Sequence, residues 1–67
     1  MHIICTTTQA AAQVLQILLH AGLRPIRDFA IQPVLSTMPP ITFTMLAILT
    51  SAQWIKIGAV ADTIVVG

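Results

Sequence analysis

Scarcity of charge is the feature that most limits what this chain can fold into. Of its 67 residues, three are Lys or Arg and two are Asp or Glu, so charged residues make up 7% of the chain, against about 25% in an average globular protein. Residues 1–23 carry no such charge, and neither do residues 29–55. Because a surface exposed to water normally holds many charged side chains, this pattern favours a membrane or an assembly interface.

The same composition excludes several classes of protein. A single cysteine, Cys5, cannot form a disulfide scaffold or a zinc site built on paired cysteines. A net charge of +1 gives no basic surface for nucleic acid. Two carboxylates lie 34 positions apart, at Asp28 and Asp62, and no nucleophile lies beside a base. We therefore predict that the chain is not an enzyme and does not bind nucleic acid.

The first neutral stretch predicts an amphipathic helix over residues 9–22. Three threonines at residues 6–8 offer hydroxyls that can cap its start, and Gly22 marks its end. Its polar residues follow one another at spacings of four, three and four, which places them on one stripe. They are Gln9, Gln13, Gln16 and His20. A narrow, uncharged polar stripe is typical of a helix at a membrane interface or in an apolar groove.

Prolines interrupt the middle of the chain, so residues 24–38 are predicted to be an extended connection. Beyond it, residues 39–60 fit one transmembrane helix. Proline suits the first helical turn, and Thr37 is placed to cap it. Trp54 is typical of a membrane interface, and Lys56 lies close enough to the end of the span for its amine to reach the headgroups.

The same segment also fits a strand, because residues 41–45 alternate apolar and polar side chains. Residues 3–7, 29–32 and 64–66 have similar compositions. With two helices between them, these strands would give the order β-α-β-β-α-β of an α+β ferredoxin-like fold. The conformation of residues 41–49 decides between the two alternatives.

Residues 12–34 read AQVLQILLHAGLRPIRDFAIQPV. About a third of the chain therefore resembles the first helix and second strand of ACT regulatory domains, through Val14, Leu18, Gly22, Phe29 and Ile31. The resemblance implies a soluble, dimeric module that binds a small amino acid.

Residues 27–37 read RDFAIQPVLST. These eleven positions resemble the start of the small single-span subunit IX of photosystem I. That resemblance implies a thylakoid membrane location and contact with chlorophyll or carotenoid.

Five side chains are candidates for a site. A neutral imidazole at His20 could ligate the metal of a chlorophyll or haem, although a hydrogen bond within the polar stripe is the commoner role. Thr50, Gln53, Trp54 and Lys56 are predicted to contact neighbouring subunits, because polar groups on a membrane helix usually face protein.

Composition averages over the whole chain, and on that ground we favour an all-α protein with one amphipathic and one transmembrane helix. Its predicted function is that of an accessory subunit of a membrane complex, integral to the membrane, with other membrane subunits and lipid as partners. The alternative is the ACT-like module. A third possibility is a structural subunit of a filament or capsid, in which identical neighbours cover the apolar surface.

Overall fold

The fold is taken from a computed structural model that describes residues 1–32 and 40–65. Two helices and four strands alternate in the order β-α-β-β-α-β. The elements are β1 (His2–Cys5), α1 (Thr8–His20), β2 (Phe29–Gln32), β3 (Ile41–Met45), α2 (Ser51–Gly58) and β4 (Thr63–Val65). This order is the one given by the α+β alternative, whereas the favoured all-α architecture is wrong.

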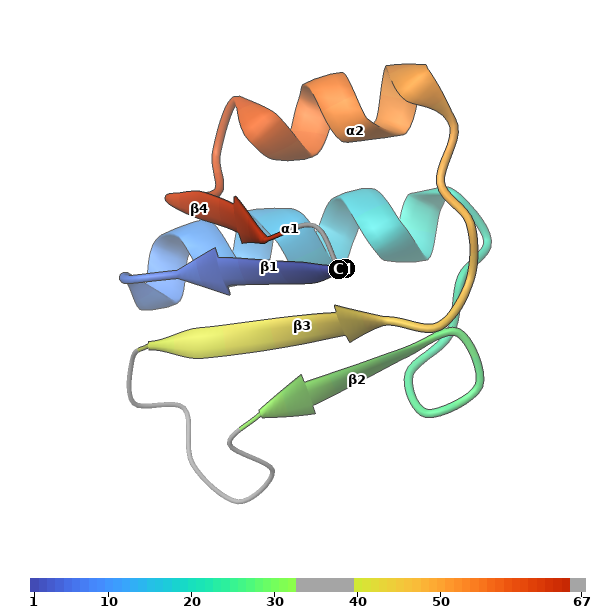
Figure 1. The fold of residues 1–67 in the computed structure, drawn as a ribbon, viewed down its shortest axis with the longest axis horizontal. Coiled ribbons are helices and arrows are strands. Elements are labelled where there is room, and N and C mark those ends of the chain that lie inside the picture. The colour runs from blue at the N-terminus through green and yellow to red at the C-terminus, as the bar shows by residue number, and fades with distance from the viewer. Residues whose placement is uncertain (33–39, 66–67) are drawn as a thin grey trace.

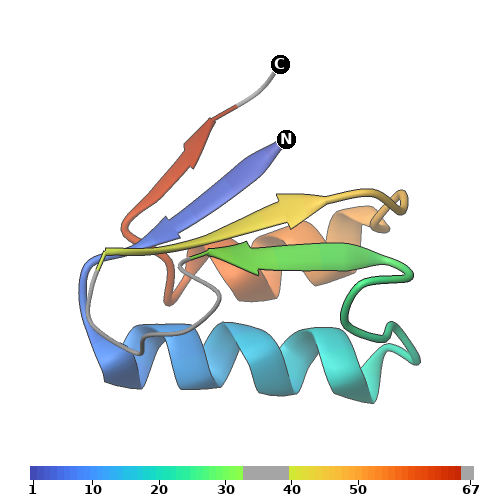
Figure 2. The same cartoon turned by 90° about the horizontal axis from the view of Figure 1, so that it is seen from below.

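The four strands form one antiparallel sheet in the order β2-β3-β1-β4. The two central strands, β1 and β3, pair with Ile3 opposite Phe43. Both helices lie on the same face of the sheet, as Figures 1 and 2 show from two directions. The chain therefore has two layers, and its first and last strands end side by side, with His2 opposite Val65.

The predicted transmembrane helix over residues 39–60 is wrong. Residues 41–45 form the strand β3, with β1 on one side and β2 on the other. The helix α2 starts only at Ser51 and is eight residues long. The start of the segment forms a strand because β-branched and aromatic side chains alternate there. The apolar ones point to the helices and the threonines point away.

Without that span, the prediction of an integral, thylakoid membrane subunit loses its basis. Among residues 1–32 and 40–65, no helix has the length and apolar character needed to cross a bilayer. The single-span architecture and the thylakoid membrane location that the photosystem I resemblance implied are therefore wrong, whereas the contacts with other subunits and with lipid stay predictions. Pro33 and Thr37, which that resemblance and the predicted helix cap used, lie outside the described residues.

The helix α1 occupies most of the predicted 9–22 segment. Thr7 caps its start, since the Thr7 hydroxyl accepts a hydrogen bond from the Ala10 amide at 3.1 Å. At its other end, Gly22 adopts a positive φ of 87°, and the Leu23 amide donates to the Leu18 carbonyl at 3.1 Å. This glycine-ended arrangement satisfies the last carbonyls of the helix and fixes the position of its final turn.

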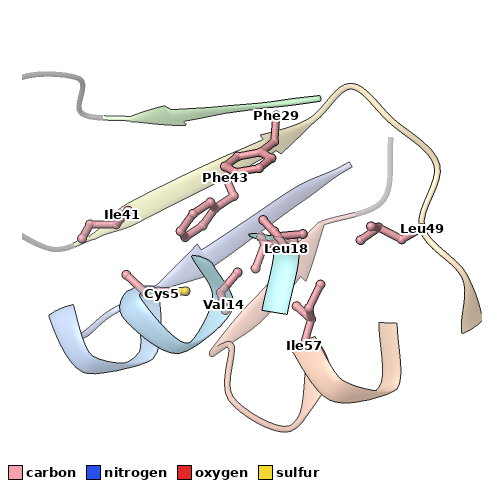
Figure 3. Packing of buried hydrophobic residues seen from close by; sticks show 10 residues of the cluster. Cys5, Val14, Leu18, Phe29, Ile41, Phe43, Leu49 and Ile57 are labelled. Carbon is pink, nitrogen blue, oxygen red and sulfur yellow. The ribbon is translucent and has the colours of Figure 1, made fainter. Parts of the chain in front are cut away.

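A hydrophobic core fills the space between the sheet and the helices. Phe29 and Phe43 pack with ring centroids 6.1 Å apart. Figure 3 shows their side chains together with Val14, Leu18 and Ile57 from the helices. The chain exposes 4302 Å², close to the approximately 4,100 Å² expected of a compact monomer of this mass. The chain is thus as compact as a typical monomer of this mass.

Candidate functional site

The candidate site is a shallow pocket between the two helices. Its volume is about 280 Å³, and it is lined by Ile17, His20, Ala21, Gln53 and Lys56. Residues at the end of α1 and in the first turns of α2 therefore face each other, because the two helices run in opposite directions (Figure 1). Three of the five site residues predicted from the sequence meet here, although no sequence pattern placed His20 beside α2.

His20 reaches the pocket as the last residue of α1 and of its polar stripe. Gln9, Gln13 and Gln16 are exposed like His20, so the stripe faces away from the core along the whole helix. His20 has no hydrogen bond to another described residue in the structure. Its imidazole is therefore free to bind a molecule that enters the pocket.

Gln53 enters the pocket from the start of α2, where it takes part in a capping box with Thr50. The Thr50 hydroxyl accepts a hydrogen bond from the Gln53 amide at 3.3 Å, and the Gln53 side-chain oxygen accepts one from the Thr50 amide at 2.9 Å. The second of these bonds uses the oxygen of the Gln53 carboxamide. Its NH₂ group can still donate two hydrogen bonds.

Lys56 lies one turn beyond Gln53 and supplies the positive charge of the pocket. Its side chain is exposed, and both aspartates of the chain are engaged elsewhere. None of the described residues that line the pocket carries a carboxylate. The pocket therefore presents an ammonium group, an imidazole and amide N–H groups to a ligand, against a wall formed by Ile17 and Ala21.

The two remaining candidates lie outside this pocket. Thr50 is the N-cap of α2, so its hydroxyl stabilises the helix itself. Trp54 lines a separate groove beside the connection between β3 and α2. Neither geometry tests the predicted contacts with partner subunits.

A cofactor at His20 would depend on that one side chain. Within the described part of the chain, no group of three His, Cys, Asp or Glu residues converges on a common point. His20 lies exposed at the end of α1. Chlorophyll, carotenoid or haem binding therefore gains no structural support.

Each of the two aspartates accepts hydrogen bonds that stabilise a connection between elements. Asp62, between α2 and β4, accepts a hydrogen bond from the Thr6 amide at 2.6 Å. This bond is the main reason why the pKa of Asp62 lies below its ordinary value. Asp28 accepts hydrogen bonds from Arg27 Nε and the Arg24 amide, both at 2.8 Å. The bond from the Arg27 side chain contributes most to its lowered pKa.

Cys5 is fully buried in the core. Burial, with a smaller contribution from the Asp62 charge, raises the pKa of its thiol. Because the thiolate is the reactive form, this environment makes Cys5 a poor nucleophile. Its role is that of a small hydrophobic side chain.

Comparisons of the chain with protein families, with curated proteins and with solved structures give no match. A function must therefore be argued from the pocket and the fold themselves.

Proposed function

We propose that this chain is a small regulatory module that binds a carboxylate metabolite, such as an amino acid, in the pocket between its helices. The observation that carries the proposal is the convergence of Lys56, His20 and Gln53 on one pocket that contains no acidic side chain. Charge-assisted hydrogen bonds from an ammonium group are strong and short with carboxylates, and an imidazole N–H is a further donor. Such a pocket selects an anion over a cation or a neutral molecule.

The size of the pocket limits the ligand. At about 280 Å³, it lies just below the range of about 300–1,000 Å³ typical of sites for drug-sized molecules. Its apolar wall, Ile17 and Ala21, suits a short aliphatic portion. A carboxylate with a few carbons fits better than a nucleotide or a long lipid.

Two further observations support a regulatory module. The element order is the one implied by the resemblance to ACT regulatory domains over residues 12–34. Binding between two helices also couples the ligand to their packing, which is one way in which a small domain transmits a signal. The role needs no chemical step, and the absence of enzymatic activity stays a prediction.

A calorimetric titration of the full chain tests the proposal. Alanine, leucine, glutamate and a simple monocarboxylate form the ligand panel. We expect at least one of them to bind, and Lys56→Gln to weaken that binding by about tenfold, which corresponds to the loss of one charge-assisted hydrogen bond.

Arg24→Gln is the matched control, because it removes an equal charge from an exposed residue that does not line the pocket. It should bind like the wild-type chain. Equal affinity of the Lys56→Gln variant and the wild type, or no heat of binding with any carboxylate, would contradict the proposed function.

A further inference from the structure

Three exposed aliphatic side chains lie at one end of the molecule, on two neighbouring connections. Ile26 lies between α1 and β2 and is 87% exposed, whereas Leu46 and Ile48 lie between β3 and α2 and are 62% and 97% exposed. Figures 1 and 2 both show these two connections at the same end of the sheet. We call residues 22–28 and 46–50 together the loop end. A single exposed aliphatic residue is ordinary, but several in one place indicate an interaction site.

The backbone fixes these side chains in position. The amides of Leu46 and Ala47 both donate to the Asp28 carbonyl, at 2.9 and 3.0 Å, so the two connections are joined. Ile26 has a φ of 73°, a left-handed conformation that is costly for a β-branched residue. Strained residues of this kind cluster at sites of binding and switching.

The loop end also carries positive charge towards the solvent. Arg24 and Arg27 are both exposed. Asp28, the one acidic residue of these two connections, is paired with Arg27, and its side chain is 16% exposed against 68% for that of Arg27. The other acidic residue, Asp62, lies at the opposite end of β1, where it accepts a hydrogen bond from the Thr6 amide. The charge that the loop end presents is therefore that of guanidinium groups.

We propose that the loop end binds the surface of an anionic lipid bilayer, with Ile26, Leu46 and Ile48 among the lipid chains and the arginines at the headgroups. Such peripheral binding depends on the apolar area that enters the interface and on the attraction of basic residues to anionic lipid. The loop end supplies both. A fluid bilayer needs no matching groove, so separate aliphatic tips suffice, whereas a stable protein interface buries about 800 Å² on each partner. The binding is reversible and needs no helix that crosses the membrane.

Trp54 lies beside the loop end and serves as a probe of this binding. It lines a groove of about 250 Å³ together with residues 45–49, and it is the only tryptophan of the chain. Tryptophan rings favour the headgroup level of a bilayer, so the fluorescence emission of Trp54 should move to shorter wavelength when vesicles are added. The loop end shares no residue with the lining of the helix pocket, so this binding is independent of the proposed carboxylate.

Co-sedimentation of the full chain with vesicles tests the proposal, using phosphatidylcholine alone and phosphatidylcholine mixed with phosphatidylglycerol. The chain should bind the mixed vesicles more tightly, and added salt should weaken that binding. Ile48→Ser should lower the partition coefficient by about tenfold, because it removes one aliphatic side chain from the lipid. Arg24→Gln should lower it by about fivefold, the effect expected of one basic residue near the surface.

Ile55→Ser is the matched control, because Ile55 is 75% exposed on α2 but lies outside both connections. This variant should bind like the wild type. Since all three substituted residues are exposed, circular dichroism should show an unchanged fold in each variant. A wild-type chain that does not bind the mixed vesicles, or equal binding by Ile48→Ser and the wild type, would overturn the proposal. Binding to soluble polyglutamate without binding to vesicles would overturn it in favour of an acidic protein partner.

Discussion

At the scale of single residues, Ile26 is the clearest site of backbone strain. It has a φ of 73°, in the left-handed region that β-branched residues rarely adopt. It is also 87% exposed, so its side chain gains little from burial. We expect Ile26→Gly to raise the free energy of unfolding by about 1 kcal/mol, because glycine adopts this conformation without a steric cost.

Urea unfolding measures this effect, and Ile26→Val is its control. Valine keeps the branched Cβ and with it the strain, so its stability should match that of the wild type. A lower stability of the glycine variant would show that the greater entropy of glycine in the unfolded chain outweighs the relief of strain.

At the scale of elements, the helix ends determine where the binding pocket forms. The Thr50 cap starts α2 and orients Gln53, whereas Gly22 ends α1 just after His20. Thr50→Ala removes the side-chain acceptor and should lower the free energy of unfolding by about 1 kcal/mol. Thr50→Ser keeps the hydroxyl and should be close to the wild type in the same denaturation experiment.

Thr50→Ala should leave carboxylate binding close to that of the wild type, since the Gln53 side-chain oxygen still accepts from the Thr50 backbone amide. If Thr50→Ala and Thr50→Ser are equally stable, the hydroxyl contributes nothing as a cap. The hydrogen bond seen in the structure would then have no energetic role.

At the scale of the whole molecule, acid stability depends on two carboxylates. The chain has only two acidic side chains, and both have pKa values below their ordinary range in the folded state. Their contribution is therefore complete above the unfolded pKa of about 3.9 and is lost as the pH falls through the folded values. Stability measured by urea unfolding should drop below about pH 4.

Asp62→Asn should reduce this drop, because the amide cannot gain a proton. The variant should also be less stable at neutral pH, where the bond from the Thr6 amide to a charged oxygen is lost. An unchanged acid profile in a double variant, Asp28→Asn with Asp62→Asn, would show that other groups control the transition.

The elements differ in how far the sequence alone could predict them. The threonines before α1 and Gly22 after it allowed the limits of this helix to be predicted, and the alternation over residues 41–45 indicated a strand. The favoured prediction failed because low charge was interpreted as apolar surface. In the structure, neutral polar side chains also reach the surface: Gln13 is exposed, and Thr42 and Thr44 are partly exposed.

The candidate site was only partly predictable. Spacing along one helix linked Gln53 to Lys56, but the approach of His20 arises from the antiparallel packing of two helices, which no local pattern encodes. The left-handed Ile26 left no signal in the sequence either, because glycine or asparagine is the usual mark of that conformation.

The central claim is that a carboxylate binds between the two helices, and amide chemical shifts of the labelled chain during titration with the ligand test it most directly. Binding in the pocket should shift the signals of both helices together, at Ile17, His20 and Ala21 on α1 and at Gln53 and Lys56 on α2. Shifts confined to other parts of the molecule, or none at saturating ligand, would contradict it.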